Sequence, residues 1–184
     1  MRLIHAFQMV ERVAHAPDLV RHENDTEHSY FLAMMAWYLI DSLHLPLDRA
    51  KTLEYALIHD LVEAYAGDTY AFDADAQASK HVREKEAAER IAREFPEVPH
   101  LHATIAQYER QEDEESVFVK ALDKLLPVLT NYLQDGRTWK AMGVTFEQFL
   151  ANKRPRCAPD ERISDLLEQM IVYFETDRAR YFSE

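Results

Sequence analysis

Apolar side chains recur every three or four residues along almost the whole chain, and this spacing constrains the fold more than any other feature. It is typical of helices with one buried face, whereas the alternation typical of strands is scarce. The 184 residues include only three glycines, few for a β-rich chain, and they form neither a Gly-x-Gly-x-x-Gly motif nor a P-loop. The sequence therefore predicts an all-α helical bundle, as a single domain over residues 1–184.

Eight helices are expected, separated by proline, glycine and capping residues. Their ranges are 2–15, 26–43, 47–66, 74–95, 99–111, 114–134, 145–152 and 160–182. Asp25 or Thr26 is expected to cap the second helix, and Asp48 lies at the start of the third. Pro127 interrupts the sixth helix and removes the hydrogen bond to the carbonyl of Asp123, so a kink is expected there.

Charge and composition exclude several classes of partner. The net charge of −12 argues against binding to nucleic-acid polymers, because such binding relies on basic surfaces. No apolar run reaches membrane-spanning length, and the single cysteine, Cys157, fits a reducing, cytoplasmic compartment. Apolar residues including Trp37, Tyr38 and the segment 171–174 favour a homodimer, although one buried core would explain the same residues.

The strongest chemical signal is the adjacent pair His59-Asp60 within the apolar stretch 56–62. Aspartate is rarely buried unless it is paired or binds a metal, and a divalent cation would use both the carboxylate and the neutral imidazole. Glu63 follows His59 by one helical turn and so faces the same side. The pair therefore indicates a metal centre with a third polar group nearby.

Two further residues could complete such a centre. His28 begins one apolar helix and Asp123 lies in the middle of another, so packing three helices could assemble two imidazoles and two carboxylates. That set suits Mn, Fe, Co, Ni or Zn. The simpler explanations are that His28 caps its helix or faces solvent and that Asp123 pairs with Lys120 or Lys124.

The order His…His-Asp…Asp on successive helices resembles the HD superfamily of metal-dependent phosphohydrolases, over about residues 12–152. The matching segments are Glu23-Asn24-x-x-Glu27-His28-Ser29, His59-Asp60-x-x-Glu63, Gly67-Asp68 and Lys120-x-x-Asp123. Within the superfamily the chain is similar to the small HD hydrolases related to 5'-deoxynucleotidases. This resemblance implies one divalent transition metal per chain, bound by His28, His59, Asp60 and Asp123.

The resemblance also implies that Glu63 and Asp68 are the acid/base and substrate-orienting carboxylates. Arg21 and Lys120 are candidate cations for a substrate phosphate, and Thr69 is a further candidate for substrate binding. The expected activity is hydrolysis of (deoxy)nucleoside 5'-monophosphates to nucleoside and phosphate by a metal-activated water. The partner is then a small phosphorylated substrate.

One departure weakens the substrate assignment. The similar nucleotidases carry an Arg-Trp pair on the first helix or just after it, whereas the stretch 11–17 here has no tryptophan. Arg12 or His15 is the available substitute. Arg21 also has a structural alternative, an ion pair with Glu23 or Glu27.

Other functions compete with this interpretation. A stringent-response hydrolase would have an acidic residue after Glu63, where this chain has Ala64. A dinuclear HD phosphodiesterase needs extra histidines, for which His81, His100 and His102 are the candidates. The remaining alternatives are hydrolysis of another small phosphorylated metabolite and, from a different class, a non-catalytic regulatory module that binds a nucleotide.

Overall fold

The computed structural model describes residues 1–17 and 20–183. The chain divides into two compact units, Met1–Val119 and Lys120–Glu184. Helices dominate both units, and the sheet among the described residues is a single two-stranded ribbon, so the all-α prediction is confirmed. Among the same residues, no helix combines the length and the apolar character needed to cross a membrane.

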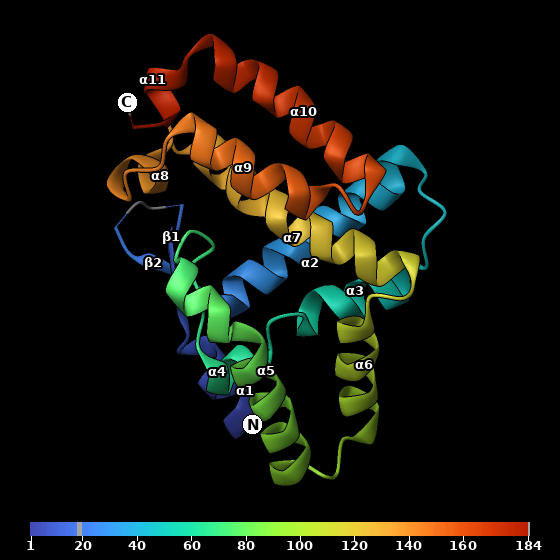
Figure 1. Cartoon of the computed structure of the whole chain (residues 1–184). Helices are drawn as coiled ribbons and strands as arrows, with labels where there is room; N and C mark the ends of the chain where they lie inside the picture. Colours follow the sequence, from blue (N-terminus) through green and yellow to red (C-terminus); the bar gives the residue numbers. More distant parts are fainter. Residues whose placement is uncertain (18–19, 184) are drawn as a thin grey trace. The chain divides into compact units, whose positions relative to one another are not determined.

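The first unit contains most of the helices and the small sheet (Figure 1). Its elements are α1 (Arg2–Gln8), β1 (Glu11–His15), β2 (His22–Asn24), α2 (Asp25–Leu43), α3 (Arg49–Ile58), α4 (Glu63–Ala66), α5 (Ala74–Glu94), α6 (Pro99–Arg110) and the start of α7 (Glu114–Leu133). The second unit holds the rest of α7, then α8 (Arg137–Ala141), α9 (Phe146–Cys157), α10 (Glu161–Thr176) and α11 (Arg178–Tyr181).

The prediction of one helix over 2–15 was wrong after its second turn. The helix ends at Gln8, and β1 pairs antiparallel with β2, with Glu11 opposite Asn24. The spacing of apolar residues did not reveal this strand, because strand formation depends on a partner elsewhere in the chain. The strand has a direct consequence for the site, since it carries Arg12 to the start of α2.

A capping box begins α2 one residue earlier than expected. The side chain of Asn24, rather than that of Asp25 or Thr26, accepts a hydrogen bond of 3.0 Å from the amide of Glu27. The Glu27 carboxylate accepts in return from the Asn24 amide at 3.2 Å. This cap sets where the helix starts, and Asp25 and His28, one turn apart, are both buried.

The expected helix over 47–66 is interrupted at residues 59–62, which include the pair His59-Asp60. α3 ends at Ile58, and a turn closed by hydrogen bonds from Leu61 to Ile58 and from Glu63 to Asp60 leads into the short α4. The turn allows two successive apolar residues to enter one core. That core consists of Leu3, Phe7, Leu61, Val62, Ala87, Ile91 and Ile105, from α1, the turn, α5 and α6. His59 and Asp60 are thereby anchored directly before a buried segment.

The core of the second unit contains a cluster of aromatic rings. Trp139 stacks on Phe182 with ring centroids 4.9 Å apart, and Phe149 and Phe174 contact both rings. α9 and α10 pack against each other within this unit (Figure 1). Two ranges differ from expectation, because α9 continues to Cys157 and the last predicted helix is divided into α10 and α11. The short α8 was not expected.

Candidate metal and carboxylate centre

Three of the four expected metal ligands meet in the first unit. His28 comes from the first turns of α2, and His59 and Asp60 follow the end of α3. Each offers one ligand atom, and these atoms lie within 4.8 Å of one another. The two imidazole rings are 5.3 Å apart between centroids, and all three residues are buried. This spacing is compatible with one shared cation.

The hydrogen bonding of His59 supports that use. Its Nδ1 lies 2.9 Å from the carbonyl oxygen of Ala56, so Nδ1 carries the proton and donates. In the neutral ring, Nε2 then presents a lone pair, and it lies 2.9 Å from Oδ2 of Asp60. Two acceptors at this distance repel each other unless a proton or a cation lies beside them. A backbone carbonyl that orients the imidazole in this way is typical of metal-binding histidines.

His28 has an acidic neighbour on the side of Nδ1. Oε2 of Glu23, at the middle of β2, lies 3.7 Å from Nδ1 of His28, and both residues are buried. This is longer than a hydrogen bond, yet the carboxylate favours a proton on Nδ1. Such a proton leaves Nε2 of His28 as the ligand atom. In the motif Glu23-x-x-x-x-His28, the glutamate therefore helps to orient the imidazole ring.

The fourth expected ligand, Asp123, belongs to the second unit, on the continuation of α7. Its carboxylate is buried and accepts a short hydrogen bond from Nζ of Lys124, which was one of the structural alternatives. Lys120, the expected phosphate contact, starts this unit and is exposed. The assignment of Asp123 as a ligand stays a prediction, as does the substrate contact of Lys120.

A second acidic group lies in the first unit. Carboxylate oxygens of Asp25, Glu63 and Asp68 come within 4.8 Å of one another and could also hold a cation. Asp25 and Glu63 are almost completely buried. Oδ2 of Asp25 and Oε2 of Glu63 make no hydrogen bond within the described residues. The sequence had indicated Asp25 only as a helix cap, because nothing in its local pattern reveals burial beside Glu63.

Arg12 connects the two acidic sets. Its Nη1 lies 2.8 Å from Oδ1 of Asp25, 3.0 Å from Oδ2 of Asp60 and 3.8 Å from Oδ1 of Asp68. One guanidinium therefore offsets part of the charge of three carboxylates. The sequence indicated Arg12 only as a substitute for the missing Arg-Trp pair, and the strand β1 explains how it reaches this position.

Burial and crowding of like charges alter two of these carboxyl groups. Burial, followed by repulsion from Asp60, raises the pKa of Glu63 to about 9, while the ammonium of Lys80 opposes the shift. Burial also raises the pKa of Asp25 to about 6, against the attraction of Arg12. Perturbed carboxyls gathered in one place are typical of catalytic and ligand-binding sites. A cation bound beside Asp60 would weaken the repulsion that Glu63 experiences.

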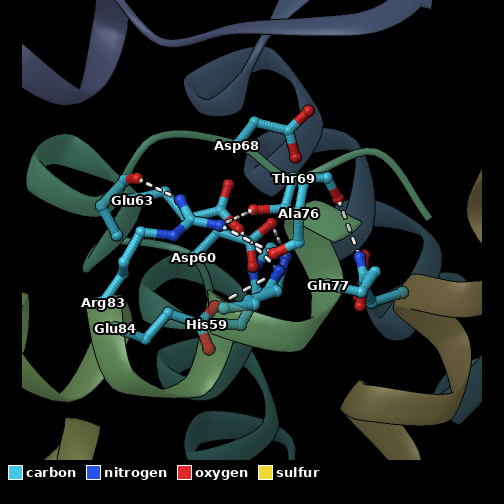
Figure 2. Close-up of polar contacts among 12 residues, drawn as sticks. His59, Asp60, Glu63, Asp68, Thr69, Ala76, Gln77, Arg83 and Glu84 are labelled. Carbon is cyan, nitrogen blue, oxygen red and sulfur yellow. Dashed lines mark hydrogen bonds and ion pairs between the residues drawn. The ribbon is translucent and has the colours of Figure 1, made fainter. Parts of the chain in front are cut away.

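Two predicted substrate contacts are engaged in bonds within the protein. Arg21 makes a bidentate ion pair with the carboxylate of Glu27, with N–O distances of 2.6 and 2.7 Å, and both side chains are exposed. This is the structural alternative considered for Arg21. The hydroxyl of Thr69 accepts a hydrogen bond of 2.8 Å from Nη2 of Arg83, on α5 (Figure 2). Substrate binding by Arg21 or Thr69 stays a prediction.

The histidines considered for a second metal lie outside both groups of candidate ligands found among the described residues. His81 and His100 are exposed, and Nε2 of His102 lies 2.8 Å from the carbonyl oxygen of Phe95. Asp68, by contrast, directly precedes Thr69 (Figure 2), and its carboxylate comes within 4.8 Å of those of Asp25 and Glu63. In the described part of the chain, carboxylates rather than additional histidines accompany the His28, His59 and Asp60 set.

Comparison with known families and proteins gives a consistent result. The family model described as HD domain matches residues 5–162. Among curated proteins, the chain is 34% identical to mouse (Mus musculus) 5'-deoxynucleotidase HDDC2 over 109 residues, covering 58% of this chain and 53% of that protein. It is 31% identical to the human (Homo sapiens) protein of the same name over 132 residues, covering 70% and 63%. The chain thus spans between half and two thirds of the length of these relatives.

Solved structures add agreement over the whole fold. A predicted metal-dependent phosphohydrolase from Magnetospirillum magnetotacticum superposes with a TM-score of 0.80 at 32% identity, covering 98% of this chain and 91% of that one. A conserved hypothetical protein from Pyrococcus furiosus shares the fold, with a TM-score of 0.64 at 22% identity, covering 95% and 96%.

Proposed function

Because the chain belongs to the HD domain family, we propose that it is a metal-dependent phosphohydrolase that cleaves small phosphate monoesters. (Deoxy)nucleoside 5'-monophosphates are the first substrates proposed, since the curated relatives are named 5'-deoxynucleotidases. The single observation that carries the proposal is the approach of Nε2 of His59 to Oδ2 of Asp60 at 2.9 Å, beside His28.

The proposed cofactor is one divalent transition metal per chain, Mn, Co, Fe, Ni or Zn. Its proposed ligands are His28, His59 and Asp60 from the first unit and Asp123 from the second. Two imidazoles and two carboxylates suit these ions, and such a set leaves positions for water and substrate. When bound, the ion would supply Lewis-acid activation of a water and of a phosphoryl oxygen.

Glu63 is the proposed general acid or base. A buried carboxyl whose pKa is raised to about 9 retains a proton at neutral pH and can donate it to the departing alkoxide. Near a bound cation, the same group would ionise more readily and could accept a proton from water. Asp68, next to Glu63, is proposed to orient the water or a sugar hydroxyl.

Arg12 is proposed to offset phosphate charge in place of the absent Arg-Trp pair. Its guanidinium lies among the carboxylates of the site, and guanidinium groups pair well with phosphate oxygens. Arg21, Lys120 and Thr69 stay proposed as further substrate contacts. The substrate preference is therefore proposed to depend on Arg12 rather than on an Arg-Trp pair.

The test is release of phosphate from a panel of nucleoside and deoxynucleoside 5'-monophosphates, with Mn²⁺ or Co²⁺ added to metal-depleted protein. Release that requires the metal supports the proposal. Binding of a nucleotide without release under any metal would favour a regulatory module instead. Elemental analysis of the loaded protein counts the ions, and two equivalents would indicate that the Asp25, Glu63 and Asp68 group also binds one.

A homodimer in the cytoplasm is also proposed. Trp37 and Tyr38 on α2 are exposed, and so are Val172 and Tyr173 on α10, whereas Ile171 and Phe174 are buried. Exposed apolar residues of either segment could therefore meet a partner. Native mass spectrometry or solution scattering tests the dimer. A monomeric mass at micromolar concentration would contradict it.

A further inference from the structure

Two basic residues on α5, Lys80 and Arg83, bind the short segment that carries both proposed catalytic carboxylates. We propose that Lys80 and Arg83, together named the α5 clamp, are positioning residues for Glu63 and for the segment 66–69 that holds Asp68. This inference rests on the proposed function, because it assigns the clamp to the same site. Neither residue was indicated by a sequence motif.

In the first contact of the α5 clamp, Lys80 donates a hydrogen bond to one oxygen of Glu63. Nζ of Lys80 lies 2.9 Å from Oε1 of Glu63 and 3.2 Å from Oε1 of Glu84, one turn further along α5. The Glu63 side chain is 1% exposed and that of Lys80 is 23% exposed, so the contact is largely shielded from solvent. Oε2 of Glu63 makes no hydrogen bond within the described residues. Lys80 thus restrains the carboxylate while one oxygen stays available for chemistry.

The second contact fixes the backbone on both sides of Asp68. Nη1 of Arg83 donates to the carbonyl of Ala66 at 2.7 Å, at the end of α4. Nη2 donates to the hydroxyl of Thr69 at 2.8 Å and to the carbonyl of Ala76 at 3.2 Å (Figure 2). Asp68 therefore lies between two residues held by the same guanidinium. A planar group with several donors in fixed directions suits this task better than an ammonium.

The backbone conformation of the segment explains why such restraint is useful. Gly67 follows α4 with φ of 76° and ψ of 152°, a conformation that mainly glycine adopts. Glycine makes the change of direction possible but gives little rigidity by itself. Gln77 adds a third restraint from α5, since its Nε2 donates to the carbonyls of Thr69 and Tyr70, each at 3.2 Å.

The spacing of Lys80 and Arg83 along α5 allows both to reach the segment that carries Glu63 and Asp68. Lys80 and Arg83 are three residues apart and so lie on one face of the helix. Further along the same face, Ala87 and Ile91 enter the core that also contains Leu61 and Val62. The same helix thus supports the turn that bears Asp60 by apolar packing and holds Glu63 by the hydrogen bond from Lys80. Catalytic groups need such support because small displacements reduce turnover strongly.

The test compares Lys80→Met and Lys80→Arg with Lys85→Met, an exposed lysine on the same helix. The full-length protein is loaded with Mn²⁺, and kcat and KM are measured on the best substrate of the panel. Lys80→Met is expected to lower kcat by about tenfold or more, part of the ~10² to 10⁴ that a general acid or base contributes. KM and metal content are expected to change less than about twofold, and Lys80→Arg is expected to recover most of the kcat.

Hydrogen exchange gives a measurement that does not depend on activity. Arg83→Met is expected to speed amide exchange of the peptide spanning 66–70 by about tenfold relative to Lys85→Met, because its two anchoring bonds are lost. Melting temperatures identify variants that are merely unfolded. If the wild type releases no phosphate with any metal, yet exchange responds as expected, the proposed function fails and the restraint by Arg83 stands.

Three outcomes would overturn the α5 clamp. One is unchanged exchange of the 66–70 peptide in Arg83→Met. The second is a kcat for Lys80→Met equal to that of Lys85→Met in an active enzyme. The third is a kcat lost equally in Lys80→Met and Lys80→Arg, in proportion to a fall in melting temperature, which would indicate a purely structural contact.

Discussion

Arg12 donates a hydrogen bond of 3.0 Å to Asp60, so a guanidinium uses the same carboxylate that is proposed to bind the metal. The residues are 48 positions apart in sequence and meet because β1 pairs with β2, which leads directly into α2. The same Nη1 also contacts Asp25, whose carboxylate is fully buried. In the absence of a metal, the Arg12 guanidinium offsets charge on both carboxylates, and a bound ion would add a second positive charge.

Arg12→Gln is therefore expected to destabilise the metal-free protein. Removing one partner of a buried ion pair typically costs about 3 kcal/mol, because the remaining carboxylates are left without compensation. Added Mn²⁺ is expected to recover more stability in Arg12→Gln than in the wild type, since the ion replaces the missing charge. Chemical denaturation with and without the ion measures both effects. Arg21→Gln is the matched control, and its exposed pair with Glu27 is expected to contribute less than about 1 kcal/mol.

Asp60→Ala and Glu63→Gln are expected to separate metal binding from chemistry. Asp60→Ala removes a proposed ligand and is expected to lose metal and phosphate release together. Glu63→Gln keeps the shape of the side chain and is expected to retain the metal while kcat falls by about 10² or more. Elemental analysis and steady-state kinetics on the same preparations measure the two properties. Unchanged turnover in Glu63→Gln would remove its proposed acid/base role.

Lys153 is expected to make stability depend on pH. Its ammonium is buried and donates to the carbonyl of Lys124 at 3.0 Å, and burial lowers its pKa from 10.5 to about 8. Between these two pH values the unfolded chain binds more protons than the folded one, so this residue makes the free energy of unfolding rise with pH. Below pH 8, the buried ammonium of Lys153 lowers the free energy of unfolding by on the order of 3 kcal/mol relative to a lysine with an ordinary pKa.

Comparison with Lys153→Met isolates this effect. The free energy of unfolding of the wild type minus that of the variant is expected to increase from pH 8 to pH 10.5 and to stay level between pH 6 and pH 7.5. Denaturant titrations at each pH measure the difference. A difference that does not vary with pH would mean that Lys153 titrates normally in the folded protein.

Gly136→Ala is expected to lower the stability of the protein more than Gly143→Ala, which serves as its matched control. Both glycines have positive φ, 68° and 66°, so each substitution is expected to cost about 1 kcal/mol from backbone conformation alone. A Cβ on Gly143 meets open space, whereas one on Gly136 meets the backbone of Tyr181. Gly136→Ala is expected to cost at least about 2 kcal/mol more, because α11 must move. Equal melting temperatures for the two variants would contradict this difference.

Local chemistry along the chain was enough to predict the helical fold class and most helix ranges. Apolar spacing depends on neighbours three and four residues away, and helix ends depend on caps such as Asp48 or Gly67, so both are readable from short windows. The motif order likewise grouped His28, His59 and Asp60, whose candidate ligand atoms lie within 4.8 Å of one another.

Other features depended on contacts between distant parts of the chain. The strand at 11–15 needs its partner β2, and the break after Ile58 follows from burying Leu61 and Val62 together in one core. Local apolar spacing is the same whether such a segment continues as a helix or turns, so packing has to select between them. These two corrections concern the segments that carry Arg12 and Asp60.

The adjacent pair His59-Asp60 was evident from residue type and order, because ligand chemistry is a property of the side chains themselves. Its surroundings were not. Arg12 beside Asp60 and Lys80 on Glu63 join residues 48 and 17 positions apart. Charges at such separations attract or repel only once folding has excluded water and brought them within a few ångströms. The ligand types therefore follow from the sequence, whereas the arrangement of charge around them is a product of tertiary packing.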